Sequence, residues 1–202
     1  TIGEDAFCDC SSLTSVTIGN SVTTIGEDAF NYCTSLTSVT IPDSVTTIGD
    51  EAFYYCTSLT SVTIGNSVTT IGEYAFWACF KLTSVTIGNS VTTIGYWAFY
   101  NCKSLKEFKG KFAADGGRCL IIDGVLNAFA LGCGATQYTI PDSVTTIGEG
   151  AFYGCSSLTS VTIGKSVSEI GKEAFKGCNI DTIVCYPKIP SKTNDSFDRF
   201  EN

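Results

Sequence analysis

The residues of this chain best suited to chemistry are its eleven cysteines. Their spacing differs from the paired CxxC of zinc sites. Seven of them close the pattern Ala-Phe-x-x-Cys, at Cys10, Cys33, Cys56, Cys79, Cys102, Cys155 and Cys178. If these positions belong to stacked repeats, their side chains point the same way and do not face one another as a disulfide requires. We therefore expect buried free thiols that pack as small apolar groups.

Four cysteines lie outside this pattern, at Cys8, Cys119, Cys133 and Cys185. Cys119 and Cys133 flank a predicted hairpin, so local closure makes a disulfide between them the main exception that we expect. Cys8 and Cys10 are close in sequence but poorly placed, because residues at i and i+2 rarely bridge.

Catalysis is disfavoured because the chain contains no histidine. This absence removes the commonest general base and the commonest neutral metal ligand. It also excludes Ser-His-Asp and Cys-His arrangements. The many Ser and Thr residues have no base near them in the repeating pattern. We predict that the protein is not an enzyme and has no catalytic residue and no cofactor.

Acidic pairs that would suit a calcium ladder recur at Glu4-Asp5, Glu27-Asp28 and Asp50-Glu51. However, the second acidic position becomes Tyr74, Trp97 and Gly150 in later units. The glycine-aspartate nonapeptide of calcium-binding β-helices is also missing. We predict no metal site and interpret the acids as favourable charges at the start of a helical turn and as a source of solubility.

The elements that must position these side chains recur at one constant interval, as Ile25, Ile48, Ile71 and Ile94 show. Repetition with a period of about 23 residues is the signature of a solenoid. The register breaks after Leu105 and resumes at Ile147. Since Cys102 and Cys155 lie 53 residues apart, one repeat must be longer by seven residues. We place this variant repeat, about 30 residues long, at 108–137.

Each unit contains two short extended segments and a turn. The segment "TSVTI" alternates polar and β-branched residues, which predicts a half-buried strand. Gly-Asn or Pro-Asp forms the following turn, and "VTTIG" is a second extended piece. The acidic residues before Ala-Phe predict one turn of α- or 3₁₀-helix. In the variant repeat, apolar runs flank Asp123-Gly124, which predicts a β-hairpin projecting from the solenoid.

The unit "LTSVTIPDSVTTIGDEAFYYC" resembles the BspA-like leucine-rich repeat of bacterial and trichomonad cell-surface proteins. The resemblance implies an α/β-type, right-handed leucine-rich-repeat solenoid of short strands and short helical or 3₁₀ turns over residues 1–202. It further implies a protein that is secreted or displayed at a cell surface. Because the sequence has no Met and its first residues "TIGEDAF" enter a repeat part-way through, we expect a fragment of a longer chain. Proteins of this family typically bind extracellular or host proteins, so we expect a protein-binding or adhesion module. The alternative is a structural spacer that displays another domain and has no partner of its own.

Binding information must lie at exposed positions where the repeats differ, because packing determines the core positions. Two neighbouring positions around Ala-Phe become aromatic in the middle units. The predicted partner-binding residues at these positions are Tyr54, Tyr74, Trp77, Trp97 and Tyr100, and Tyr96 in the same region belongs to the predicted set. Tyr55 and Phe80 add to the same region. An exposed aromatic patch is typical of an interaction surface, although the rings could equally cover the edge of the stack and pack only on one another.

The strand face is the second candidate surface, and it carries a monotonous row of Ser and Thr. Glu107 and Lys109 interrupt this row and complete the predicted partner-binding set. Ser and Thr are also simply good solvent-facing strand residues. A regular hydroxyl array could order water as ice-binding proteins do, but we expect a curved sheet and keep this as a lesser alternative.

Charge excludes two classes of partner. The net charge is −8, from 12 basic and 20 acidic residues. Nucleic acid and anionic membranes both require clustered Lys and Arg. No apolar run approaches the ~20 residues of a membrane-spanning helix, so we expect no membrane insertion.

A last, loose repeat is predicted around Ser196-Phe197. We see no clear polar cap at either end, which favours weak end-to-end self-association.

Overall fold

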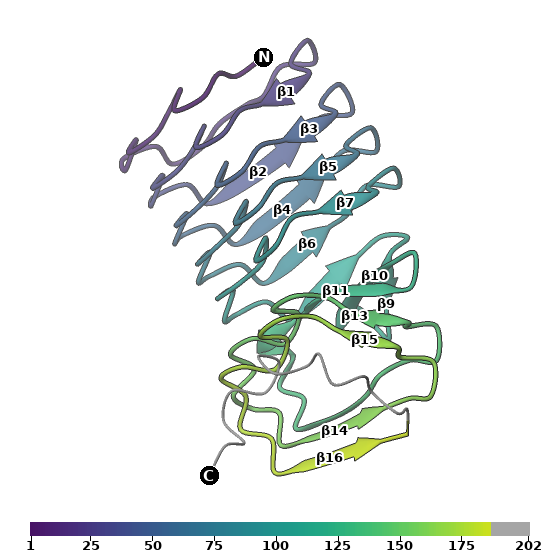
Figure 1. The fold of residues 1–202 in the computed structure, drawn as a ribbon. Coiled ribbons are helices and arrows are strands. Elements are labelled where there is room, and N and C mark those ends of the chain that lie inside the picture. Colours follow the sequence, from purple (N-terminus) through teal and green to yellow (C-terminus); the bar gives the residue numbers. More distant parts are fainter. Residues whose placement is uncertain (187–202) are drawn as a thin grey trace.

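The computed structural model describes residues 1–186. They form a stack of turns in which each repeat lies against the next (Figure 1). One parallel sheet contains β1 (Thr24–Ile25), β3 (Thr47–Ile48), β5 (Thr70–Ile71) and β7 (Thr93–Ile94). A second contains β2 (Ser38–Ile41), β4 (Ser61–Ile64), β6 (Ser84–Thr86) and β8 (Glu107–Lys109). Ser38 pairs with Ser61 and Ser61 with Ser84, so the repeat interval sets the strand register.

The second half of the chain restarts this pattern after the variant repeat. Its strand face consists of β12 (Gln137–Thr139), β14 (Ser160–Ile163) and β16 (Thr182–Cys185). The other sheet has the order β15 (Glu169–Ile170), β13 (Thr146–Ile147), β11 (Val125–Phe129), β10 (Cys119–Ile122) and β9 (Ala113–Ala114). The solenoid is of the expected right-handed type. The loose repeat predicted around Ser196-Phe197 lies outside the described residues.

Phenylalanine rings from successive repeats form the axis of the core. Phe7, Phe30, Phe53, Phe76 and Phe99 stack with centroids 5.1–5.4 Å apart and planes within 9° of parallel. Phe30, Phe53 and Phe76 are completely buried. The predicted ladder of like residues is therefore confirmed, and it follows directly from the parallel register of the strands.

The predicted helical turn before each cysteine is wrong. Residues 1–186 contain a single short helix, the 3₁₀-helix η1 (Leu131–Cys133), and the label α/β is therefore too loose. In the turn segments, alternate backbone N–H groups bond to the next repeat. Phe30 N–H donates to Ala52 O at 2.8 Å and Tyr32 N–H to Tyr54 O at 2.9 Å. Since these donors serve the neighbouring repeat, they are not available for the i→i−4 bonds of a helix.

Strands β10 and β11 of the variant repeat are antiparallel and meet at Asp123 and Gly124. They do not project from the solenoid. Instead, β11 continues as the parallel neighbour of β13, with Leu126 opposite Ile147. The strand that sequence reasoning assigned to an appendage thus belongs to the wall of the stack. Phe99 turns edge-on to Phe108 at 76°, and a second stack begins with Phe129 and Phe152.

Candidate functional site

The turn segment that carries the aromatic side chains has two left-handed positions in each regular repeat. Asp28 (φ 54°) and Tyr32 (φ 55°) hold them in one repeat, and Glu51 (φ 53°) and Tyr55 (φ 57°) in the next. Such φ values are uncommon outside glycine. The ladder of hydrogen bonds between repeats holds the backbone in this form. It thereby places Asn31, Tyr54 and their equivalents one above another at the edge of the stack.

Eight rings along this edge form a continuous surface, which we call the aromatic ridge. Its members are Tyr32, Tyr54, Tyr55, Trp77, Phe80, Trp97, Tyr100 and Tyr153. Tyr54 stacks on Trp77 with centroids 4.6 Å apart and an angle of 4°. Trp77 in turn contacts Tyr100 at 5.7 Å. Tyr32 is 41% exposed, and the other seven rings are half-buried. The rings therefore pack on one another and still present their outer faces to solvent.

Ridge residues from the repeats on either side of the variant repeat contact each other directly. Tyr100 meets Tyr153 edge-on at 4.7 Å, and Trp97 meets Tyr153 at 4.8 Å. The variant repeat contributes the smaller residues Asn127 and Ala130 at the equivalent positions. A cavity of only about 20 Å³ remains beneath these rings. Burial, followed by the neighbouring Tyr153, raises the pKa of Tyr100 to about 12.

The structure brings together four of the six predicted aromatic residues. Tyr54, Trp77, Trp97 and Tyr100 belong to the ridge, whereas Tyr74 and Tyr96 make no ring contact within residues 1–186. Tyr96 is nevertheless 55% exposed beside it. Sequence reasoning missed Tyr32 as a member, although its position one residue before the cysteine matches that of Tyr55.

The charged pair Glu107 and Lys109 lies on β8 in the strand face, whereas the ridge lies on turn segments that belong to no sheet. The Lys109 Nζ is 2.9 Å from Glu107 Oε1, and both side chains are about half exposed. They neutralise each other and belong to the strand face. An exposed pair of this kind contributes at most ~1 kcal/mol to stability.

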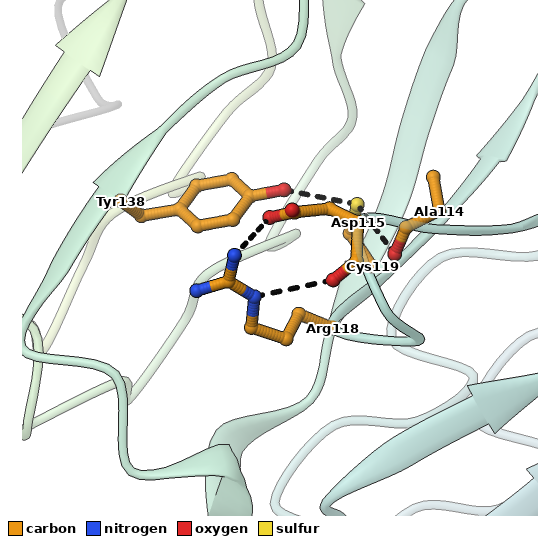
Figure 2. A network of polar contacts seen from close by, with 5 residues as sticks. All are labelled: Ala114, Asp115, Arg118, Cys119 and Tyr138. Carbon is orange, nitrogen blue, oxygen red and sulfur yellow. Dashed lines mark hydrogen bonds and ion pairs between the residues drawn. The ribbon is translucent and has the colours of Figure 1, made fainter.

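A polar groove of about 360 Å³ lies on the strand face next to the variant repeat. Side chains of Asp115, Arg118, Gln137, Tyr138, Thr139, Ser160 and Thr162 line it. Figure 2 shows three of these residues, and there Arg118 Nη2 lies 2.7 Å from Asp115 Oδ2 and Arg118 Nε donates to Asp115 O at 3.2 Å. The guanidinium carbon lies 5.5 Å from the centroid of the Tyr138 ring. The repeat pattern did not predict this groove, because its charged residues Asp115 and Arg118 come from the variant repeat, whereas Ser160 and Thr162 belong to a regular strand.

The cysteines form no disulfide among residues 1–186. The expected Cys119–Cys133 bridge is therefore wrong. Cys119 Sγ instead lies 3.0 Å from the Tyr138 hydroxyl (Figure 2). In the repeating column, buried thiols bond to phenylalanine carbonyls, as Cys56 Sγ does to Phe30 O at 3.2 Å. Six of the seven thiols in this column are buried as expected, but the prediction is wrong for Cys10, which is exposed.

No group of three or more His, Cys, Asp or Glu side chains within 1–186 could hold a metal ion. Over the same range there is no helix of the length and apolarity that crossing a bilayer requires.

Family comparison connects this architecture with known proteins. The model of the BspA type leucine rich repeat region matches residues 1–112 and 126–202 in six copies. The chain belongs to the BspA-type leucine-rich repeat family. The unmatched residues 113–125 fall inside the variant repeat, where β9, β10 and the turn at Asp123 replace the usual strand and turn. A comparison with curated proteins gives no significant match.

Three solved structures are similar to this BspA-type chain. A leucine rich cell surface protein from Faecalibacterium prausnitzii is 28% identical, with a TM-score of 0.55, over 90% of this chain and 63% of its own. The T. pallidum leucine rich repeat protein is 27% identical, with a TM-score of 0.61, over 88% and 69%. The pneumococcal vaccine antigen PcpA is 22% identical, with a TM-score of 0.68. The match covers 81% of this chain and 42% of PcpA, and it supports the fold alone. The chain thus spans less than two thirds of the first and third proteins.

Proposed function

We propose that this BspA-type solenoid is a non-enzymatic protein-binding module that adheres to extracellular or host proteins through the aromatic ridge. The observation that carries the proposal is the contact between Tyr54, Trp77 and Tyr100, which forms a row of half-exposed rings across three repeats. Aromatic side chains offer large contact areas and lose little conformational entropy on binding. Display at a cell surface or secretion is part of the proposal, and it is supported by the similarity to the Faecalibacterium cell surface protein.

The test replaces Trp77 and Tyr100 with Ser. Beads coated with the wild-type protein or the variant are washed over immobilised basement-membrane matrix, and retained beads are counted. The expected result is loss of most of the retention by the variant. Tyr186→Ser provides the matched control, because Tyr186 is 70% exposed and lies outside the ridge. Equal retention of the variant and the wild type would exclude the ridge and favour the spacer alternative.

Weak end-to-end association is a second part of the proposal. Phe7 is 40% exposed, and its ring stacks on Phe30 of the following repeat. A second copy could cover its outer face. Light scattering over a range of protein concentrations should show a rising mean mass, and Phe7→Ser should abolish the rise.

A further inference from the structure

The charge of the chain is strongly divided along its length. Residues 1–80 contain nine carboxylates and neither Lys nor Arg. Residues 81–202 contain the other eleven acidic residues and all twelve basic residues, so their net charge is +1. The whole net charge of −8 therefore originates in the first repeats.

Most of these carboxylates lie in the turn segments that also carry the ridge. The seven are Glu4, Asp5, Glu27, Asp28, Asp50, Glu51 and Glu73. Asp28 N–H donates to Asp50 O at 3.0 Å and Glu51 N–H to Glu73 O at 2.8 Å, so the acidic segments stack on one another. Glu51 occupies the same repeat position as the aromatic Tyr74. We call these seven residues the acidic flank of the ridge.

None of the seven carboxylates of the acidic flank forms an ion pair in the part of the chain that the structure describes. The three ion pairs between described residues involve Glu107, Asp115 and Glu173, all of which come later in the chain than Phe80. Burial, followed by repulsion from Asp28, Glu27 and Asp50, raises the pKa of the Glu51 carboxyl. Like charges held this close favour the approach of a cation, which would relieve their repulsion.

Two rings of the ridge already accept a cation from this chain. Lys103 Nζ lies 5.8 Å from the centroid of Phe80, and Lys176 Nζ lies 6.0 Å from that of Tyr153. Both distances are within the range of a cation–π interaction. In the acidic half, the rings of Tyr32, Tyr54 and Trp77 belong to the same turn segments as the acidic flank, and no carboxylate of the flank forms an ion pair within residues 1–186. Cation–π attraction and ion pairing therefore favour the same kind of ligand there.

We propose that the acidic half of the ridge binds a Lys- and Arg-rich segment of a partner protein. The cationic side chains lie over Tyr54 and Trp77 and pair with the carboxylates of Glu51 and Glu73. This inference rests on the proposed function, because it assigns a partner class to the same ridge. An acidic segment is disfavoured by repulsion, and a neutral one would gain nothing from the flank.

The experiment uses fluorescently labelled peptides of twelve residues in which Gly and Ser alternate with Arg and Lys, or with Glu as the matched acidic peptide. Fluorescence anisotropy gives the Kd at 50 and 500 mM NaCl. We expect the basic peptide to bind about tenfold more weakly at high salt, because the Debye length shortens. Glu51→Gln with Glu73→Gln should weaken binding by roughly three- to tenfold at low salt. The matched charge control is Glu169→Gln with Asp181→Asn, both exposed in the second stack, and it should change the Kd less than about twofold.

Failure of the inference and failure of the proposed function give different results. Equal affinity for the acidic peptide, no measurable binding of the basic peptide, or insensitivity to Glu51→Gln with Glu73→Gln overturns the basic-partner inference. Matrix adhesion that still depends on Trp77 and Tyr100 would then leave the proposed function standing. If Trp77→Ser binds the basic peptide as the wild type does, the ridge takes no part in recognition, and the inference is wrong as well.

Discussion

The indole ring of Trp97 lies over Gly150, although 53 residues separate them in the chain. A Cβ added to Gly150 would be 3.0 Å from Cε3 and Cζ3 of the indole. The glycine thus leaves the space in which the ring rests and in which it also meets Tyr153 at 4.8 Å. This contact closes the ridge over the variant repeat, where the neighbouring repeats are no longer related by the constant interval.

Gly150→Ala should displace the Trp97 ring. The added methyl group meets the indole. In addition, Gly150 has a φ of 62°, which residues other than glycine rarely adopt. Tryptophan emission recorded in a Trp77→Phe background should shift towards the red as the indole becomes more exposed. Gly134→Ala is the control, because Gly134 also has a positive φ but no atom within 4 Å of its Cβ position. An unchanged spectrum for Gly150→Ala would contradict this packing of the indole on the glycine.

Phe53→Ala should cost about 3–5 kcal/mol of unfolding free energy, because it leaves a cavity in a fully buried ladder. Phe53 stacks on Phe30 and Phe76 at 5.2 Å each, so both neighbours lose a contact. Urea unfolding followed by circular dichroism measures the change. Phe7→Ala removes the same side chain where it is 40% exposed and should cost less than half as much. Equal costs would mean that the stacked interior contributes little.

Gly72→Ala should destabilise the solenoid by about 1–3 kcal/mol, since neighbouring repeats approach too closely for a methyl group. Its added Cβ would be 2.5 Å from the carbonyl carbon of Gly49 and from the Asp50 nitrogen. Gly19→Ala is the matched control, because nothing lies within 4 Å of the corresponding Cβ. The urea midpoint should fall for the first variant and stay nearly constant for the second. A similar midpoint for both would exclude this close approach.

Stability should fall as the pH rises from about 9 to 11. Burial raises the pKa of Cys33 and of Cys155 from 9.0 to about 11. Below pH 9 the thiols are protonated in both states, and their contribution is fully present. Between pH 9 and 11 the thiols ionise in the unfolded state but keep their protons in the folded state. The unfolded state is thereby stabilised relative to the folded state, and the free energy of unfolding falls.

Urea midpoints at pH 8 and pH 10.5 check this dependence. A Cys33→Ala variant serves as the comparison. It should be less stable at pH 8 but lose less stability between the two pH values, because one titrating group has been removed. A variant that loses as much as the wild type would show that other groups dominate the alkaline transition.

The amino-acid sequence alone determined the regular part of the fold. Identical spacing of Ile25, Ile48 and Ile71 forces equivalent residues into parallel register, so the buried phenylalanine ladder and the thiol column follow from the period. The same reasoning identified Tyr54, Trp77 and Tyr100 as variable edge positions. It also predicted a turn at Asp123-Gly124, because that dipeptide favours a tight reversal wherever it occurs.

Only the tertiary structure decided what happens where repetition ends or where the backbone has a choice. The turn segments do not form a helix, because their N–H groups donate hydrogen bonds to the next repeat. These long-range bonds cannot be predicted from local helix propensity. The groove of Asp115 and Arg118 and the contact of Trp97 with Gly150 both arise at the variant repeat. There the repeat interval no longer predicts which residues are neighbours, so packing between segments that are distant in the sequence determines the contacts.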